Sequence, residues 1–321
     1  MLQKLAPKSK GSLPAGILRI VIKPFIGTGI GRFSLVNKIY QFFAKVFIIP
    51  QENQLVTING YKMYINLDRE KGLDGISQEL IFHGTYEKYA TSLFQQYVKR
   101  GMTVITIGAN IGYFVLLFSS LVGKDGKVFA FEPAPQNFNL LVRNIELNGY
   151  DNIVALQKAV SDRSGAGILY IDKSDPAGHS LFQEATNQVT GGKAETLSVD
   201  MVSLDEYFKN NNISADIIQM DIQGAEPLAV KGMENLISSS KEVKIFTEFW
   251  PFGLEKSGFS AEQYWTQLNQ LGFKYIYLIN ERHQNLEPTS LVEAVKLCRG
   301  NVITPPSAVN LLCTATPLDC I

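Results

Sequence analysis

The chain has 321 residues, of which 45% are hydrophobic and 19% are charged, a composition typical of one large or two small globular domains. Its 30 basic and 30 acidic residues balance, so no global attraction to nucleic acid is expected. The three cysteines form no CxxC motif or Cys/His cluster, which argues against a metal site and against a disulfide framework. We therefore predict a reducing, cytoplasmic location.

Residues 1–52 are predicted to form a basic helical N-terminal arm. The first 50 residues contain eight Lys or Arg residues and no Asp or Glu. The apolar stretch 13–26 is too short and too interrupted by charge and proline to span a membrane, and it lacks the clean core of a signal peptide. We expect the arm to pack on the following domain. The alternative is a peripheral contact of the arm with an anionic membrane or a lipid-linked substrate.

The next two elements are a hairpin and a helix. Residues 54–65 alternate in polarity around Asn59-Gly60, the favoured pair for a two-residue hairpin turn. Residues 76–100 have a helical pattern, and Gly101 is the expected C-cap.

From residue 103 onward, apolar β-branched runs alternate with amphipathic helical stretches. This alternation predicts an α/β fold with a doubly wound, mostly parallel sheet and helices on both faces. Residues 166–200 are less regular and are expected to form a β insertion, or substrate flap, within a domain that covers 53–321. The strands are expected at 103–107, 127–131, 153–160, 216–221, 243–248 and 273–279, and the helices at 111–122, 135–148, 203–211, 225–238 and 260–271.

A turn built on Gly108, Asn110 and Gly112 follows the strand 103–107. Glycine and residues that tolerate positive φ let a ligand lie against the backbone at such a corner. Glu132 ends the next strand 24 residues after Gly108. This spacing is near the ~20 residues that separate a nucleotide-binding turn from the acid that holds the ribose hydroxyls.

The residues of this turn narrow the choice of ligand. A dinucleotide site needs glycines where this chain has Asn110 and Tyr113, which disfavours a nicotinamide oxidoreductase, and the Gly-Lys-Ser/Thr of a P-loop is absent. The turn therefore fits a ligand with an adenosyl group and no diphosphate, such as S-adenosylmethionine. Ser161 and Asp162 follow the next strand and are expected to contact adenine, although Asp162 also suits a loop cap.

Several motifs, taken in order, resemble the FkbM-type methyltransferase family over about residues 50–280. The resemblance implies a Rossmann-like class I methyltransferase with a seven-stranded sheet that uses S-adenosylmethionine to methylate hydroxyls of sugars, glycolipids or polyketide-like natural products. A non-catalytic binding or scaffold protein of the same fold is the alternative. The motifs are Gly-Thr-Tyr-Glu (84–87), Gly-Ala-Asn-Ile-Gly (108–112), Phe-Glu-Pro-Ala-Pro-Gln-Asn-Phe (131–138) with Asn144 and Asn148, Ser-Leu-Asp (203–205) and Met-Asp-Ile-Gln-Gly-Ala-Glu (220–226).

Two positions depart from the family pattern. The family usually has Asp where this chain has Thr106, and that Asp normally helps to order the turn and the amino-acid end of the cofactor. The family also usually has Glu where this chain has Gln223. Gln keeps the hydrogen-bonding shape but loses a candidate base.

Asp221 is the leading candidate for the base or for the carboxylate that orients the acceptor, because it ends strand 216–221 beside the turn. A helix cap is its alternative role. His179 is a further catalytic candidate, since a histidine titrates near neutral pH. Glu248, which ends the predicted strand 243–248, is another. We expect a small-molecule, glycan or glycolipid acceptor and no nucleic acid, and a homodimer stays open. The cofactor is assigned to Glu87, Thr106, Gly108, Asn110, Gly112, Tyr113, Glu132, Pro133, Ser161, Asp162 and Asp221, and the acceptor to Tyr86, Glu226 and Trp250.

Overall fold

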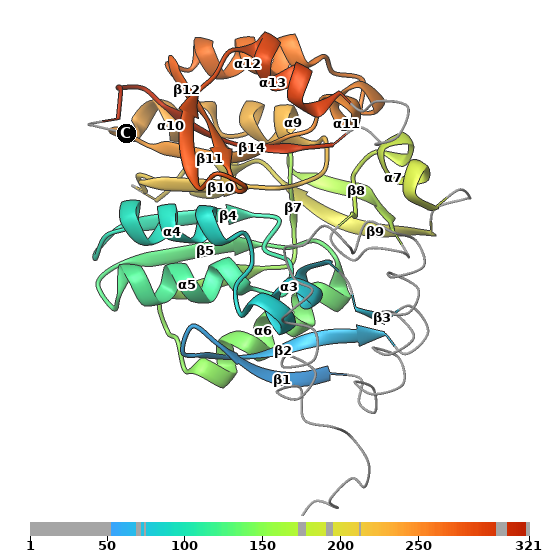
Figure 1. The fold of residues 1–321 in the computed structure, drawn as a ribbon, viewed down its shortest axis with the longest axis vertical. Helices are drawn as coiled ribbons and strands as arrows, with labels where there is room; N and C mark the ends of the chain where they lie inside the picture. Colours follow the sequence, from blue (N-terminus) through green and yellow to red (C-terminus); the bar gives the residue numbers. More distant parts are fainter. Residues whose placement is uncertain are drawn as a thin grey trace, which may run out of the picture. The chain divides into compact units, whose positions relative to one another are not determined.

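The computed structural model describes residues 53–68, 72–73, 75–172, 178–190, 195–211, 213–299 and 307–318 (Figure 1). The chain divides into two compact units, Met1–Thr85 and Tyr86–Ile321. The predicted arm 1–52 lies outside the described residues, as do parts of the predicted insertion. No helix in the described part of the chain is long and apolar enough to cross a membrane.

In the first unit, β1 (Asn53–Ile58) and β2 (Tyr61–Asp68) form the expected antiparallel hairpin. Asn59 and Gly60 both have positive φ, as a tight two-residue turn requires. The two-residue strand β3 (Gly72–Leu73) pairs with β2, and α3 (Gly75–His83) follows.

The single helix expected at 76–100 is wrong, because the chain forms two helices there. After α3, Gly84 and Glu87 adopt left-handed backbone conformations, and α4 (Lys88–Tyr97) begins at the next residue. A left-handed residue interrupts the i to i−4 hydrogen bonding of a helix. Gly101 is not the cap of α4 either, since the Val98 N–H closes its last turn on the Phe94 carbonyl.

The second unit is built on an eight-stranded sheet in the order β13-β12-β14-β11-β10-β4-β5-β6. The five strands from β11 to β6 are parallel, and β14 runs antiparallel between β11 and β12. This confirms the doubly wound, mostly parallel fold, although the sheet has eight strands where the resemblance implies seven, and β13 and β14 are not among the six strands placed from the sequence. The bounds are β4 (Thr103–Ile107), β5 (Lys127–Phe131), β6 (Ile153–Leu156), β10 (Ile217–Met220), β11 (Lys244–Phe249), β12 (Tyr275–Asn280), β13 (Asn285–Pro288) and β14 (Val309–Thr314).

The helix expected at 225–238 is two helices that separate at Gly232. A Cβ at this glycine would lie 2.0 Å from the Ser161 carbonyl oxygen, so the loop after β7 approaches the backbone there. Two further helices, α11 and α13, were not expected. The helices of this unit besides α4 are α5 (Tyr113–Val122), α6 (Pro135–Asn148), α7 (Gln183–Thr190), α8 (Leu204–Phe208), α9 (Glu226–Lys231), α10 (Glu234–Ser239), α11 (Pro251–Lys256), α12 (Ala261–Gln270) and α13 (Leu291–Cys298).

The expected strand 153–160 is divided between two sheets. Its first part is β6, and its last two residues form β7 (Ala159–Val160), which pairs with β9 (Glu195–Val202). β8 (Gly165–Ile171) completes this small sheet antiparallel to β9, which confirms the β insertion. Helix α7, between β8 and β9, was not expected.

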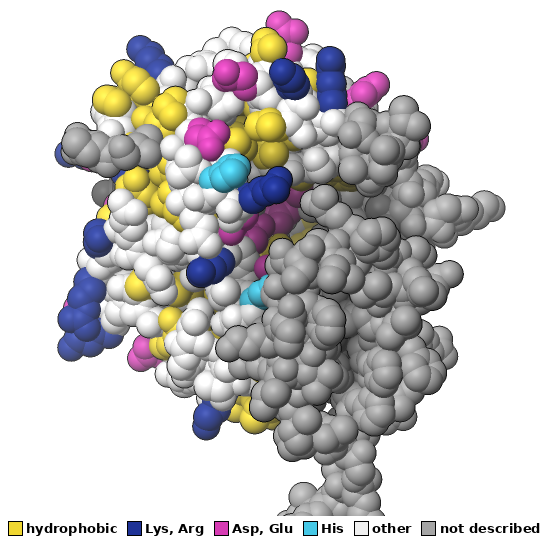
Figure 2. Space-filling view, viewed as in Figure 1, with side chains coloured by type: hydrophobic (Ala, Val, Ile, Leu, Met, Phe, Trp, Pro, Cys, Tyr) yellow, Lys and Arg dark blue, Asp and Glu magenta, His cyan; other side chains and the backbone are white. Residues whose placement is uncertain are grey.

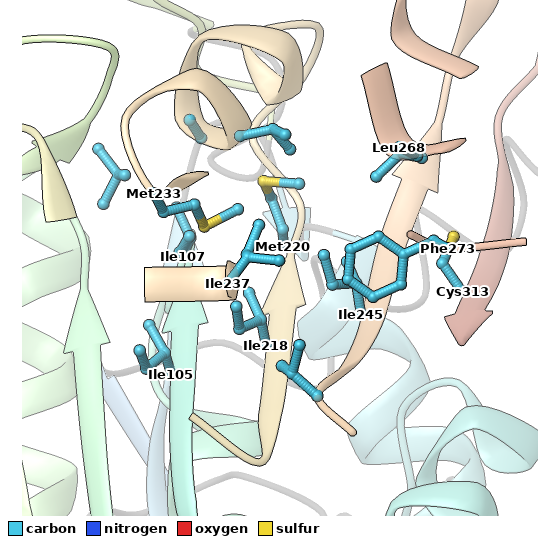
Figure 3. Packing of buried hydrophobic residues seen from close by; sticks show 14 of the residues in the cluster. Ile105, Ile107, Ile218, Met220, Met233, Ile237, Ile245, Leu268, Phe273 and Cys313 are labelled. Atoms are coloured by element: carbon cyan, nitrogen blue, oxygen red, sulfur yellow. The ribbon is translucent and has the colours of Figure 1, made fainter. Parts of the chain in front are cut away.

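The largest core cluster lies on one face of the main sheet (Figure 3). Successive side chains of a strand point to opposite faces. Ile245 of β11 therefore joins this cluster, whereas Phe246 packs on the other face against Phe94 of α4, with ring centroids 4.4 Å apart. Both faces are thus covered, and the carboxyl ends of the parallel strands are held at one edge. Residues labelled in the cluster are Ile105, Ile107, Ile218, Met220, Met233, Ile237, Ile245, Leu268, Phe273 and Cys313.

Candidate functional site

The turn after β4 is closed against the two neighbouring strands. The N–H groups of Gly108 and Ala109 donate to the Phe131 carbonyl at 3.0 and 2.9 Å. Gly108 has φ 85°, and a Cβ there would lie 2.0 Å from the Asp221 carbonyl oxygen. Glycine is therefore required at 108 both by the backbone conformation and by the close approach of the end of β10.

Asn110 stabilises the same turn from within. It has φ 48°, and its Oδ1 accepts the Ile111 N–H at 2.7 Å. Its own N–H donates to Glu132 at 2.8 Å. The side chain is thus used to form the turn. Gly112, at φ 96°, closes the turn, and a Cβ there would lie 2.6 Å from Leu141 Cδ1.

Glu132 is held by backbone donors at the carboxyl end of β5. One carboxylate oxygen accepts from Asn110 and the other from the Ala134 N–H at 2.9 Å. The side chain is 5% exposed, and this burial raises the pKa of Glu132 to about 7, against the lowering effect of its hydrogen bonds. The Asn137 side chain donates to the same carboxylate. A carboxylate has about four lone-pair sites, so about one remains for a further donor such as a ribose hydroxyl.

The contacts of three predicted site residues point away from the turn: those of Thr106, Tyr113 and Tyr86. Thr106 is fully buried and donates its hydroxyl to Gln219 of the adjacent strand. The Tyr113 hydroxyl lies 3.2 Å from that of Thr91, and its ring packs edge-on against Tyr86 at 6.1 Å. These contacts favour packing roles over the cofactor and acceptor contacts expected from the sequence. Pro133 follows Glu132 directly and leads into α6.

Asp162 is paired with two cations. Its carboxylate lies 3.1 Å from Lys231 Nζ and 3.4 Å from Arg163 Nη1, and its side chain is 13% exposed. The neighbouring Ser161 is buried, and its N–H donates to the Val202 carbonyl. These ion pairs occupy the Asp162 carboxylate and do not favour a direct contact with adenine.

Asp221 and Glu248 are joined by a single amide. Gln223 Nε2 donates to Asp221 Oδ1 at 2.9 Å and to Glu248 Oε2 at 3.0 Å. The two carboxylates belong to neighbouring strands, since Asp221 follows β10 and Glu248 is in β11. The structure therefore brings together two of the three catalytic candidates and adds Gln223 between them, which the sequence pattern could not show.

Glu226 closes the turn between β10 and α9. Its Oε1 accepts the Ile222 N–H at 3.0 Å and its Oε2 accepts the Gly224 N–H at 2.9 Å. The side chain is 1% exposed, and burial raises the pKa of Glu226 to about 7. Both oxygens serve the backbone, so these contacts support a structural role and do not favour the expected binding of the acceptor.

His179 lacks the geometry of a base. Its Nδ1 accepts the Asp172 N–H at 3.1 Å, so in the neutral ring the proton is on Nε2 and no free lone pair remains. The neighbouring Ser180 donates its hydroxyl to the Gln223 carbonyl at 2.9 Å, which ties this segment to the turn after β10. Residues 173–177 of the same loop lie outside the described residues.

A cavity of about 500 Å³ opens beside Glu248. Its walls combine Glu87, whose Oε1 accepts from Asn310 Nδ2 at 2.8 Å, with the ends of β11, β12 and β14. Glu281, also in the wall, accepts the Tyr89 and Ala90 N–H groups and so caps α4. Asn310 and Glu281 were missed because β14 was not expected and the link to α4 spans more than 190 residues.

Carboxylates dominate the electrostatics of this region. Burial, followed by the negative charges of Asp221, Glu226 and Glu87, raises the pKa of Glu248 well above its ordinary value, and the Gln223 hydrogen bond opposes this effect. Figure 2 shows acidic side chains gathered in a hollow of the visible face, with basic side chains and a histidine near them. Among the described residues, no group of three His, Cys, Asp or Glu side chains could hold a metal ion.

Trp250 lies between the end of β11 and the start of α11. Its ring packs on Gly253, where an added Cβ would lie 1.9 Å from the indole, and its centroid is 5.9 Å from that of Phe252. The side chain is half-buried. It therefore combines a packing role with a partly exposed ring close in sequence to Glu248.

Comparisons with known proteins agree with the motifs. The model of the family described as Methyltransferase FkbM domain matches residues 106–275. Methyltransferase sdnD of Sordaria araneosa is 27% identical over 156 residues, which cover 41% of this chain and 60% of that protein. The hexuronic acid methyltransferase AglP of Haloferax volcanii is 25% identical over 134 residues, covering 41% of this chain and 50% of that protein. The chain thus spans less than two thirds of the length of these relatives.

Among solved structures, Aeropyrum pernix fibrillarin in complex with natively bound S-adenosyl-L-methionine aligns with 82% of this chain and 82% of its own, at 10% identity and a TM-score of 0.39.

Proposed function

The chain belongs to the FkbM methyltransferase family, whose members depend on S-adenosylmethionine, and on that premise we propose that it methylates a hydroxyl of a sugar, glycolipid or polyketide-like natural product. The observation that carries the proposal is the carboxylate pair Asp221 and Glu248, which lies at the carboxyl ends of adjacent parallel strands. Ligands of open α/β sheets bind at this edge.

The residues around the first turn suit the methyl donor. Glu132 would hold a ribose hydroxyl with the lone pair that Asn110, Ala134 and Asn137 leave free. Gly108 and Gly112 would let the adenosyl group and the amino-acid end approach the backbone. The bound S-adenosylmethionine supplies a methyl group on a sulfonium, which is a good leaving group.

The acceptor side of the site would be formed by the two carboxylates and the cavity. A cavity of about 500 Å³ is within the range of ~300–1,000 Å³ usual for small-molecule sites. Side-chain oxygens of Glu87, Glu248 and Asn310 in its walls can accept hydrogen bonds from hydroxyls. A polyhydroxylated acceptor fits these walls, and one relative is named for the methylation of a hexuronic acid.

The proposed reaction is a displacement at carbon. The acceptor oxygen forms a bond to the methyl carbon, the carbon–sulfur bond breaks with its electron pair passing to sulfur, and the hydroxyl proton passes to Asp221 or Glu248. Alignment of the reactants supplies much of the rate. A positioned base adds about 10²- to 10⁴-fold.

Calorimetric titration with S-adenosylmethionine tests the donor half of the proposal. We expect the wild-type protein to bind, and Glu255→Gln, at an exposed glutamate of α11, to leave binding unchanged. Glu132→Gln should weaken binding by about tenfold or more, because the amide nitrogen replaces one acceptor oxygen. Absence of wild-type binding at millimolar cofactor would overturn the proposal.

A methyl-transfer assay tests the acceptor half. The protein is incubated with methyl-labelled S-adenosylmethionine and free hexuronic acids, and the products are identified by mass spectrometry. A labelled methyl ether on a hydroxyl of the sugar supports the proposal, whereas a labelled methyl ester of its carboxyl group would contradict methylation of a hydroxyl. A second incubation replaces the hexuronic acids with cell extract. A labelled methyl group on nitrogen or carbon of any product would contradict O-methylation.

A further inference from the structure

Gln223 has a backbone conformation that requires support. Its φ is 54°, in the left-handed region that few residues other than glycine adopt. Its carbonyl accepts the Ser180 hydroxyl at 2.9 Å, and the next N–H, that of Gly224, is bound by Glu226. Conformations of this kind persist where the surrounding structure holds them, and they cluster at functional sites.

The Gln223 amide is a double donor between two acids. A primary amide has two N–H bonds, and here one points to Asp221 and the other to Glu248, at 2.9 and 3.0 Å. A glutamate of the same size would be a pure acceptor when ionised and would add a third negative charge. The neutral amide can instead donate to both carboxyl groups without adding charge.

We propose that Gln223 is a positioning residue that holds Asp221 and Glu248 as a carboxylate pair ready to take the proton of the acceptor hydroxyl. This inference rests on the proposed methyl transfer. As the oxygen–methyl bond forms and the carbon–sulfur bond breaks, the proton moves to one carboxylate oxygen, while the amide keeps both groups oriented. Gln223, where the family usually has Glu, then orients the two carboxylates and does not mark a loss of function.

The environment of Glu248 determines the direction of the test. The Gln223 hydrogen bond lowers the pKa of Glu248, whereas burial and neighbouring acids raise it. Removing the amide donor should therefore raise that pKa further, and a carboxylate at position 223 should raise it most. The titratable or charged groups that face Glu248 or share its cavity are Asp221, Glu226, Glu87, Tyr264, Cys298, Glu281, Arg282 and His283.

The test is a pH titration of the full chain labelled with ¹³C at the glutamate carboxyl carbons, followed by NMR. The Glu248 resonance is assigned by its absence from Glu248→Gln. We expect its midpoint to rise by about one pH unit or more in Gln223→Met, which keeps the volume but removes both donors, and to rise further in Gln223→Glu.

Controls separate this inference from a purely structural role and from the proposed function. Gln263→Met, in the exposed capping box of α12, should leave the Glu248 midpoint unchanged. An unchanged midpoint in folded Gln223→Met or Gln223→Glu protein would overturn the inference, and the use of two variants guards against misfolding of one. The titration needs no cofactor, so failure of the proposed function appears separately, as absent binding of S-adenosylmethionine.

Discussion

The buried Glu132 predicts a specific pH dependence of stability. Its pKa in the folded protein is about 7, against an ordinary value of 4.5, mainly because burial disfavours the charged form. At about 1.4 kcal/mol per pH unit, this difference corresponds to about 3 kcal/mol. Because the folded pKa is raised, the folded state binds the proton more tightly. The contribution to stability is full below pH 4.5, is lost between pH 4.5 and about 7, and is constant above that.

Urea unfolding of the wild type and Glu132→Gln between pH 5 and 8 measures this contribution. The free energy of unfolding of the wild type should fall relative to that of Glu132→Gln by about 2.5 kcal/mol over the range, because glutamine cannot ionise. Glu255→Gln should track the wild type. A difference between wild type and Glu132→Gln that stays constant with pH would refute the assignment of a buried, neutralised carboxyl.

Three further predictions concern the turn, a helix cap and the base. Gly108→Ala should lower the free energy of unfolding by at least about 2 kcal/mol more than Gly101→Ala does, as thermal unfolding would measure. Both glycines have positive φ, but only at position 108 would the added Cβ lie 2.0 Å from a carbonyl oxygen. Equal losses would contradict this. Glu281→Gln should lower stability by about 0.5–2 kcal/mol by weakening the cap of α4, as urea unfolding would detect. Glu248→Gln should reduce methyl transfer by about 10²- to 10⁴-fold at unchanged cofactor affinity; unchanged transfer would remove Glu248 from the chemistry.

The local parts of the fold could be predicted from the sequence. β4, β5 and α6 have the bounds expected, because each is an uninterrupted apolar or amphipathic run that ends at a glycine, a proline or an Asn-Gly pair. The pairing of β14 between β11 and β12 could not be predicted, since it joins residues as far apart in the sequence as Ile245 and Cys313 without a turn signal. The capping box at Ser290 and Glu293 was a readable signal for α13 that was overlooked.

The candidate site divides in the same way. Spacing along the chain identified Glu132, because a strand fixes both its distance from the turn and the edge at which it ends. Asp221 and Glu226 look alike in the sequence, yet one carboxylate accepts from the Gln223 amide while the other binds two backbone N–H groups. Only the position of neighbouring strands and helices decides between these roles. For the same reason the joining role of Gln223 could not be read from its departure from the family pattern.

A crystal structure of the complex with S-adenosylhomocysteine, the product of the proposed reaction, tests the central claim most directly. The account predicts that a ribose hydroxyl hydrogen-bonds to Glu132 and that the sulfur faces Asp221 and Glu248. A nucleoside bound elsewhere, or one that leaves Glu132 without a contact, would contradict a methyl-transfer site at this edge of the sheet.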